Sequence, residues 1–144
     1  MVRLAQKKDL PEVLTLLKEF HSESLDKYNL FCNDETAKIT MKLLYRTSFV
    51  LVIDNKIVGV LGGIIATYPL NNELIYHEWI WFVNKKHRLH GIGLYRKLEE
   101  YCREQNIKKI VMVTLADNSI KLEKFYRRLG FTFLEKHYIK ELNN

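Results

Sequence analysis

The sequence predicts an α/β (α+β) fold, a single mixed sheet flanked by helices. Three long apolar segments between Phe49 and Val83 are separated by turn residues at Asp54–Lys56 and Pro69–Asn72, a pattern typical of an antiparallel meander. After Val83 the pattern changes to an amphipathic helical stretch that leads into another apolar run. Such a strand–helix–strand crossover is right-handed and joins parallel strands. Residues 1–144 are therefore expected to form one domain with the order β-α-α-β-β-β-α-β-α-β.

The N-terminal part of the chain predicts one short strand and two helices. The strand covers Val2–Ala5, and Asp9 begins the first helix as its capping residue, followed by a proline and, three positions on, a glutamate. Apolar residues then recur at helical spacing; they are Leu10, Val13, Leu14, Leu17 and Phe20. Residues 22–33 predict a loop, and Asp34–Arg46 predict the second helix.

The middle of the chain predicts the meander. Its strands cover 49–53, 57–68 and 73–83, and the glycines within the second strand mark bends or a bulge. The C-terminal part predicts a helix over 91–105, a buried strand over 107–115, a helix over 119–129 closed by Gly130 in the left-handed conformation, and a final strand over 131–142.

Composition limits the class of protein. The chain of 144 residues is 47% hydrophobic and 28% charged, as in ordinary soluble proteins. No apolar stretch follows a basic start, so no signal peptide is expected. The longest apolar run, Ile57–Ala66, is too short to cross a bilayer. Cys32 and Cys102 lie far apart without metal-ligand spacing, which indicates a reducing compartment and predicts a cytoplasmic protein without a bound metal.

The net charge of +6 is concentrated in one region. Residues 84–109 contain eight basic and three acidic residues. A polyphosphate ligand, a nucleic acid and a solvated helix face each explain such an excess. No known nucleic-acid-binding motif accompanies it, so nucleic acid is not the expected partner.

The stretch Phe82–Leu94 is the strongest candidate for a binding site. A strand runs into a basic loop, Gly91 and Gly93 follow, and a helix begins. A helix N-terminus carries unpaired N–H groups and partial positive charge, and glycine lets a ligand approach the backbone, which favours a phosphate. A tight connection without a ligand explains the same pattern. The dinucleotide fingerprint is excluded because Arg96 stands where its third glycine belongs.

Two motifs carry a family resemblance. They are Arg88-Leu89-His90-Gly91-Ile92-Gly93 and Phe125-Tyr126-Arg127-Arg128-Leu129-Gly130-Phe131. The first resembles the acyl-CoA loop Gln/Arg-x-x-Gly-x-Gly/Ala of the GNAT-type N-acetyltransferases, and the second resembles the Tyr…Gly-Phe end of that family's last helix. The resemblance extends over nearly the whole chain. The sequence departs from the family at Lys85, where proline is common, and at Leu89, where glycine is common.

The resemblance implies a GNAT-like acyl-CoA N-acyltransferase fold and acetyl-CoA as the cofactor. The backbone of Phe82 and Val83 would pair with the pantetheine amides, and either Asn118 or Ser119 would make a further contact. The residues implied to hold the pyrophosphate form one run: Arg88, Leu89, His90, Gly91, Ile92, Gly93 and Leu94.

The resemblance further implies transfer of an acetyl group to a primary amine by direct attack, with Tyr126 protonating the departing thiolate. Either Glu78 or His77 would act as the base, or water would relay the proton. Strand alternation places these two side chains on opposite faces unless a bulge intervenes. Apolar neighbours would raise the pKa of Glu78, whereas His77 needs no shift to act near neutral pH.

The acceptor remains open between a small molecule and a protein lysine or N-terminus, and the chain is expected to be a monomer or homodimer with no membrane partner. The alternative function is a catalytically weak or inactive acyl-CoA-binding module of the same fold. Binding of acetyl-CoA without turnover of any amine would distinguish this module from the enzyme.

Overall fold

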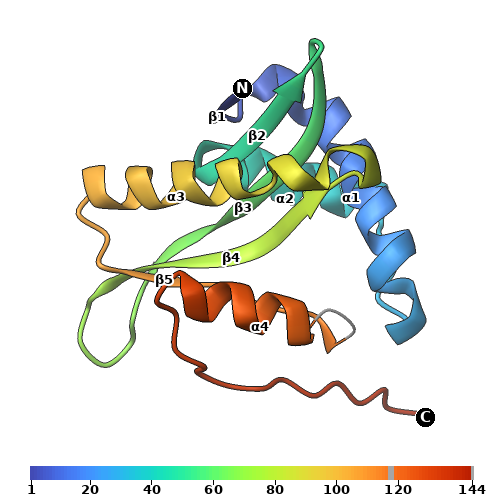
Figure 1. Cartoon of the computed structure of the whole chain (residues 1–144). Helices are drawn as coiled ribbons and strands as arrows, with labels where there is room; N and C mark the ends of the chain where they lie inside the picture. Colours follow the sequence, from blue (N-terminus) through green and yellow to red (C-terminus); the bar gives the residue numbers. More distant parts are fainter. Residues whose placement is uncertain (117–118, 144) are drawn as a thin grey trace.

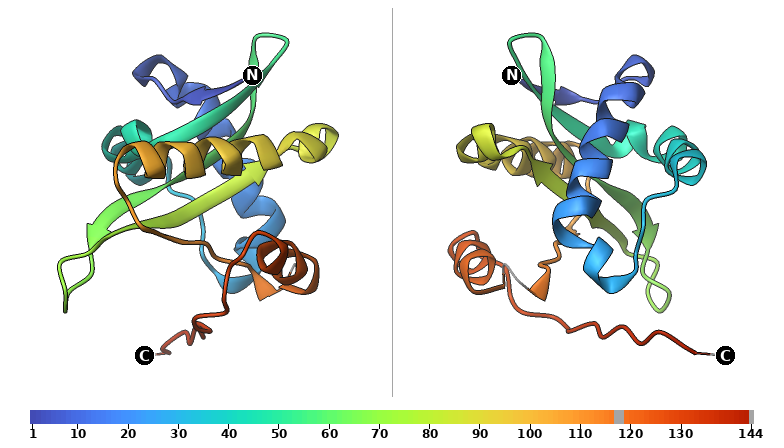
Figure 2. Two further views of the ribbon diagram at one scale, coloured as in Figure 1. Left: turned by 60° about the vertical axis from the view of Figure 1, so that its left-hand side comes forward. Right: turned by 90° about the vertical axis from the view of Figure 1, so that its right-hand side faces the viewer.

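The computed structural model describes residues 1–116 and 119–143, which form a five-stranded sheet with helices on both faces (Figures 1 and 2). The strands are β1 (Val2–Leu4), β2 (Ser48–Ile53), β3 (Lys56–Thr67), β4 (Leu74–Val83) and β5 (Lys109–Val111). The α-helices are α1 (Leu10–Ser24), α2 (Asp34–Leu44), α3 (Ile92–Glu104) and α4 (Ser119–Arg128). Short 3₁₀ helices are η1 (Lys7–Asp9), η2 (Asp26–Tyr28), η3 (Tyr45–Thr47) and η4 (Lys85–His90).

The strands lie in the order β1-β2-β3-β4-β5. Neighbours from β1 to β4 are antiparallel, whereas β5 is parallel to β4. The connection from β4 to β5 passes through α3, as the strand–helix–strand pattern predicts. The predicted fold class, a mixed sheet flanked by helices, is therefore confirmed.

The core has two layers because both faces of the sheet are covered. Strand alternation sends Phe49 and Leu51 to the α3 face, where they pack with Leu94 and Leu98. Val50 points to the opposite face and joins the cluster that α1 and α2 cover. Helices α1 and α2 lie on one side of the sheet, and α3 and α4 on the other (Figure 2).

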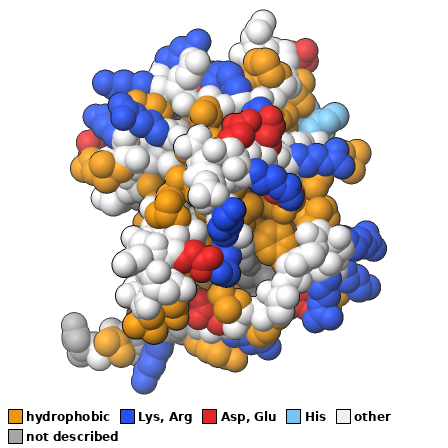
Figure 3. All heavy atoms as spheres, turned by 90° about the vertical axis from the view of Figure 1, so that its left-hand side faces the viewer, with side chains coloured by type: hydrophobic (Ala, Val, Ile, Leu, Met, Phe, Trp, Pro, Cys, Tyr) orange, Lys and Arg blue, Asp and Glu red, His pale blue; other side chains and the backbone are white. Residues whose placement is uncertain are grey.

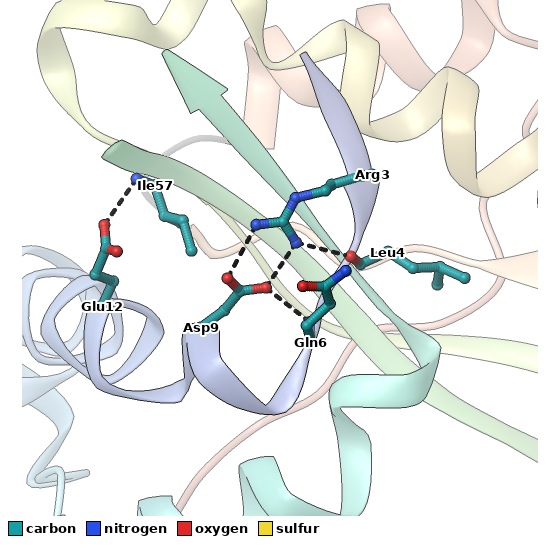
Figure 4. Close-up of polar contacts among 6 residues, drawn as sticks. All are labelled: Arg3, Leu4, Gln6, Asp9, Glu12 and Ile57. Carbon is teal, nitrogen blue, oxygen red and sulfur yellow. Dashed lines mark hydrogen bonds and ion pairs between the residues drawn. The ribbon is translucent and has the colours of Figure 1, made fainter. Parts of the chain in front are cut away.

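Asp9 occupies the N-cap position of α1, as predicted, but its side chain makes no capping hydrogen bond, because its carboxylate turns toward β1 instead (Figure 4). Two nitrogens of Arg3 donate to it at 2.7 and 2.9 Å, and the Gln6 N–H donates at 2.7 Å. Glu12 likewise reaches away from the helix and accepts from the Ile57 N–H at 2.9 Å. A tertiary ion pair therefore replaces the local cap, and both carboxylates attach the start of α1 to the sheet.

The predicted loop over residues 22–33 is partly helical, since it contains the end of α1 and the turn η2. Asn33 caps α2 by accepting a hydrogen bond from the Thr36 N–H at 3.0 Å. The expected second helix, Asp34–Arg46, ends as an α-helix at Leu44 and continues as η3. None of the helices in the described residues is long and apolar enough to span a membrane.

The predicted final strand over 131–142 does not form, and the strand expected over 107–115 is limited to Lys109–Val111. Within the described part of the last segment, the one backbone hydrogen bond runs from the Phe131 N–H back to the Tyr126 carbonyl. The segment leaves α4 and passes below it (Figure 1). Aromatic and β-branched side chains favour a strand, but a strand also needs backbone pairing, which this segment lacks.

Candidate active site

The site lies where β4 and β5 stop pairing. Residues Ile75–His77 of β4 pair with Lys109–Val111 of β5, and β5 then ends while β4 continues to Val83. The β4 backbone from Glu78 to Val83 therefore has no β5 partner, although its other edge remains paired with β3. An edge of this kind presents N–H and C=O groups to a ligand.

Glu78 and Tyr126 meet at this point through Val113. Oε2 of Glu78 accepts a hydrogen bond from the Val113 N–H at 3.1 Å. The Tyr126 hydroxyl donates to the Val113 carbonyl at 2.8 Å. Both side chains are buried, so the structure brings two of the three predicted catalytic residues together.

Burial shifts the acid–base properties of both groups. Removal from water raises the pKa of Glu78 to about 8, because the charged form loses its hydration, while the hydrogen bond from Val113 acts in the opposite direction. Burial also raises the pKa of Tyr126, and the negative charge of Glu78 raises it further. A carboxyl group with a pKa of about 8 and a protonated phenol therefore contact the same residue, a combination typical of sites that move protons.

His77 lies apart from this pair. It follows Tyr76 and precedes Glu78 in regular strand pairing, so its side chain faces the other side of the sheet from Glu78. The bulge comes only after Glu78: Gly62 pairs with Ile80 and Gly63 with Glu78, which leaves Trp79 as the extra residue of β4. The side chain of His77 is half-buried and makes no hydrogen bond within the described residues.

Glycine at position 63 permits this bulge. A Cβ atom added to Gly63 would lie 2.0 Å from the His77 carbonyl oxygen, so no larger residue fits without movement of the backbone. The extra residue Trp79 is 56% exposed, in contrast to Ile80 and Glu78 beside it, which are buried. The bulge therefore decides which side chains of β4 face the site.

An aromatic cluster places Tyr126. Its ring lies 6.4 Å from that of Trp81 on β4 and 5.3 Å from that of Phe131, measured between ring centroids. Phe125 also packs on Trp81, at 5.8 Å. These contacts hold α4 against β4, which fixes the position of the hydroxyl group above Val113.

The end of α4 has the geometry that the second motif predicts. Gly130 adopts φ +90°, the Phe131 N–H donates to the Tyr126 carbonyl at 2.9 Å, and the Gly130 N–H donates to the Arg127 carbonyl at 3.1 Å. This pattern is a Schellman cap, and the Phe131–Tyr126 ring contact is the apolar contact that accompanies it. Gly130 and Phe131 therefore end α4, and the ring of Phe131 also packs against the ring of Tyr126.

The glycine turn begins α3, and η4 precedes it in place of an open loop. No side chain caps this end of α3. The Gly91 N–H donates to the Arg88 carbonyl and the Leu94 N–H to the Gly91 carbonyl, both at 3.1 Å, so among the described residues the N–H groups of Ile92 and Gly93 are the ones left for an anion. A Cβ atom added to Gly91 would lie 3.2 Å from the Arg88 carbonyl oxygen and 3.3 Å from Cγ2 of Val83. Gly93 faces β1 instead, where the nearest atom to an added Cβ is Cγ2 of Val2, at 3.3 Å.

The other residues of the first motif have different environments. Leu94 is fully buried in the core, whereas Leu89 is 94% exposed and His90 is also exposed. Ile92 is half-buried against the α3 cluster. Only the backbones of these residues are therefore suited to contact a ligand at the end of α3, apart from the exposed side chain of His90.

At the end of β4, Phe82 is buried under α1 and Val83 under α3. The Arg88 side chain folds back over this end of the strand. Its Nε atom donates to the Val83 carbonyl at 3.3 Å, and its Nη2 atom contacts Glu23 of α1 at 2.8 Å. The predictions for Asn118 and for the side chain of Ser119 lie outside the described residues.

Two residues that contact the candidate site residues could not be identified from the sequence. Val113 acts through its backbone, for which no residue type is diagnostic, and Glu23 is one of several acidic residues on a helix far away in the sequence. No group of three or more His, Cys, Asp or Glu side chains within the described residues is placed to hold a metal ion.

The basic excess around the glycine turn is partly neutralised. Acidic partners pair with Lys97, Arg103 and Lys109, namely Glu100, Glu99 and Glu73. Figure 3 shows the side of the molecule at the C-terminal end of α3, away from the glycine turn; there, too, basic side chains lie in separate groups with acidic and apolar side chains between them. This arrangement differs from the continuous basic surface that binds nucleic acid.

Comparisons with known proteins agree with this geometry. Residues 10–131 match the acetyltransferase (GNAT) family. The fold resembles that of ribosomal-protein-alanine N-acetyltransferase from Brucella melitensis biovar Abortus 2308, with a TM-score of 0.77, 18% identity, and coverage of 99% of this chain and 98% of that one. An acetyltransferase of Trypanosoma brucei gives a TM-score of 0.73 at 18% identity, with 99% of each chain covered.

A further similar structure is that of AAC(6')-Iy in complex with the bisubstrate analogue CoA-S-monomethyl-acetylneamine. It gives a TM-score of 0.76 at 16% identity and covers 100% of this chain and 98% of that one. No curated protein matches the sequence. Identities this low establish the fold alone, whereas the family match spans most of the sequence, and on that ground this chain belongs to the acetyltransferase (GNAT) family.

Proposed function

We propose that this protein transfers an acetyl group from acetyl-CoA to a primary amine, with Glu78 as the base and Tyr126 as the acid. The observation that carries the proposal is the convergence of both side chains on Val113, at the point where β4 and β5 separate. Membership of the acetyltransferase family supports the reaction class. The acceptor is a small molecule or a protein lysine or N-terminus.

The residues around the site fit acetyl-CoA. The β4 edge from Glu78 to Val83 lacks a β5 partner and offers backbone groups to the pantetheine amides. At the uncapped end of α3, the N–H groups of Ile92 and Gly93 are offered to the pyrophosphate, and Gly91 leaves room beside Val83 and Arg88 that a Cβ would crowd. Bound there, acetyl-CoA supplies an activated acetyl thioester.

Glu78 accepts a proton from the ammonium form of the acceptor, directly or through water, so that the neutral amine attacks the thioester carbonyl carbon. Its pKa of about 8 suits this role near neutral pH, because a base works best when its pKa is close to the working pH. Tyr126 would turn its hydroxyl from the Val113 carbonyl to the leaving sulfur and donate its proton as the carbon–sulfur bond breaks. The second proton of the attacking nitrogen would then return to the Tyr126 phenolate through water, and Glu78 would release its proton to solvent. The products are the acetylated amine and CoA.

The test is calorimetric titration with acetyl-CoA, followed by turnover measurements over a panel of amines that includes polyamines, aminoglycosides and lysine peptides. We expect saturable binding and acetylation of at least one acceptor class, with turnover lost in Glu78→Gln. Binding without turnover of any acceptor would instead support the inactive acyl-CoA-binding module. Absence of binding at millimolar acetyl-CoA would exclude both functions.

A further inference from the structure

The ion pair between Arg88 and Glu23 connects the glycine turn to the last turn of α1. Nη2 of Arg88 lies 2.8 Å from Oε2 of Glu23, and the two residues are 65 positions apart in the sequence. Nε of the same guanidinium donates to the Val83 carbonyl at 3.3 Å. The side chain of Glu23 is 28% exposed and that of Arg88 is 52% exposed.

These contacts occupy a particular edge of the guanidinium group. Nε and Nη2 are neighbouring nitrogens on one edge of the planar guanidinium group. Arginine uses this edge to bind a carboxylate or phosphate through two parallel hydrogen bonds. Here Val83 and Glu23 take one nitrogen each. A pyrophosphate at the start of α3 can use this edge of Arg88 only if Glu23 gives it up.

Glu23 is held in position to compete. One turn earlier on α1, Phe20 packs on Phe82 of β4 with ring centroids 5.8 Å apart. Nδ1 of His21 lies 2.8 Å from the Leu30 carbonyl oxygen, which ties the following segment to the same end of the helix. The carboxylate therefore stays beside Arg88, while an ion pair this exposed is weak enough to exchange.

We propose that Glu23 sets the affinity of the protein for acetyl-CoA by competing with the cofactor's pyrophosphate for Arg88. This inference rests on the proposed function. Arg88 exchanges Glu23 for a phosphate when the cofactor binds, and Glu23 also places a negative charge near the phosphates. Both effects weaken binding. Because the product CoA carries the same pyrophosphate, the competition also accelerates product release.

The experiment measures the Kd of acetyl-CoA by calorimetry for the wild type, Glu23→Gln, Glu19→Gln, Arg88→Gln and the Glu23→Gln/Arg88→Gln double variant. Glu19 is the matched control, because it lies one turn earlier on α1 and has no contact with Arg88 among the described residues. We expect Glu23→Gln to bind about fivefold more tightly, the factor that one unit charge at roughly 4 Å in water provides. Glu19→Gln should change the Kd less than twofold.

The double variant isolates the competition. In the Arg88→Gln background, we expect Glu23→Gln to tighten binding by a smaller factor than in the wild type, because the charge effect remains and the competition for Arg88 is gone. An equal gain in both backgrounds would reduce the effect of Glu23 to charge repulsion and overturn the competition. Equal or weaker binding by Glu23→Gln, in a variant whose melting temperature shows that it is folded, would overturn the competition. If the wild type binds and acetylates normally, that result leaves the proposed function intact. If no folded variant binds acetyl-CoA, both the competition and the proposed function are wrong.

Discussion

Glu78 and Tyr126 hydrogen-bond to the same residue, Val113, the carboxylate through its N–H at 3.1 Å and the phenol through its carbonyl at 2.8 Å. Because β5 ends at Val111, the backbone N–H and carbonyl groups of Val113 have no strand partner within the described residues. The side chains therefore take the place that backbone pairing would otherwise fill. This relationship motivates the first predictions.

Replacing Glu78 with glutamine should remove the base and keep the shape of the side chain. We expect kcat to fall by about 10²–10⁴, the usual contribution of general acid–base catalysis. In the wild type, kcat/KM should rise as the pH passes through about 8, where Glu78 loses its proton. That rise should be absent from the residual activity of Glu78→Gln. A wild-type profile that is flat between pH 6 and 9 would contradict the assignment.

Glu78 should also make stability depend on pH. Its pKa is raised in the folded protein to about 8 from an ordinary value of 4.5, so between these values the folded state holds a proton that the unfolded chain has released. The contribution of Glu78 to the free energy of unfolding is therefore greatest below about pH 4.5. This contribution is lost as the pH rises through about 8. Urea unfolding of the wild type and Glu78→Gln at several pH values should show a decrease in this range for the wild type only.

Tyr126→Phe tests the acid. We expect kcat to fall by about 10²–10⁴ with KM nearly constant, since one hydroxyl is lost and the aromatic packing is kept. The lost hydrogen bond to Val113 should cost about 1 kcal/mol of stability. Tyr101→Phe, the same change on α3 against Phe49, is the control and should turn over normally. Normal kcat in Tyr126→Phe would leave this tyrosine as an anchor of α4 without a chemical role.

Substitutions at Gly91 test the anion site. Its φ of −61° is accessible to any residue, so both Gly91→Ala and Gly91→Glu should fold. An added methyl group would crowd the Arg88 carbonyl and Val83, and should weaken acetyl-CoA binding by about tenfold, which corresponds to about 1.4 kcal/mol. Glutamate adds bulk and negative charge, so binding should be abolished. Unchanged calorimetric affinity in Gly91→Glu would mean that the glycine serves only the turn.

Asp9→Asn tests the ion pair that joins α1 to β1. The Asp9 side chain is 5% exposed and Arg3 donates two hydrogen bonds to it, so we expect a loss of about 1.5–3 kcal/mol in urea unfolding at pH 7. Glu35→Gln, whose side chain is 82% exposed in its pair with Lys38, should change stability by less than about 0.5 kcal/mol. Equal effects of the two substitutions would contradict the importance of the buried pair.

The same pair should contribute to acid unfolding. The hydrogen bonds from Arg3 hold the pKa of Asp9 below its ordinary value of 3.8, although burial acts in the opposite direction. The stabilisation is therefore complete above the unfolded pKa and is lost as the pH falls through the lower, folded value. Asp9→Asn should lose less stability than the wild type on acidification below about pH 4.

Local signals in the sequence predict local structure well. Gly130 and Phe131 indicate the end of α4, and the structure confirms the left-handed cap there. The predicted meander and the crossover through α3 are also confirmed. Turns, caps and apolar periodicity depend on residues that are near in sequence, so the pattern itself contains the necessary information.

Predictions that depend on contacts between different elements are less reliable. Asp9 stands at the N-cap position of α1, but its carboxylate accepts from Arg3 and from the Gln6 N–H instead of from the first turn of the helix. Residues 131–142 contain aromatic and β-branched residues that favour a strand, but no neighbouring strand pairs with them within the described residues. In both cases the local preference is real, and a tertiary interaction or its absence decides the outcome.

The sequence by itself determined the fold class, the order of elements through α4, the glycine turn and the set of candidate side chains, because these follow from residue types and short-range spacing. Only the tertiary structure decided that Glu78 rather than His77 lies beside Tyr126, that Val113 connects them, and that Arg88 is paired with Glu23. The physical reason is that hydrogen bonds and ion pairs between elements depend on bulge position, strand register and helix placement. These are properties of the packed chain, which no single segment encodes.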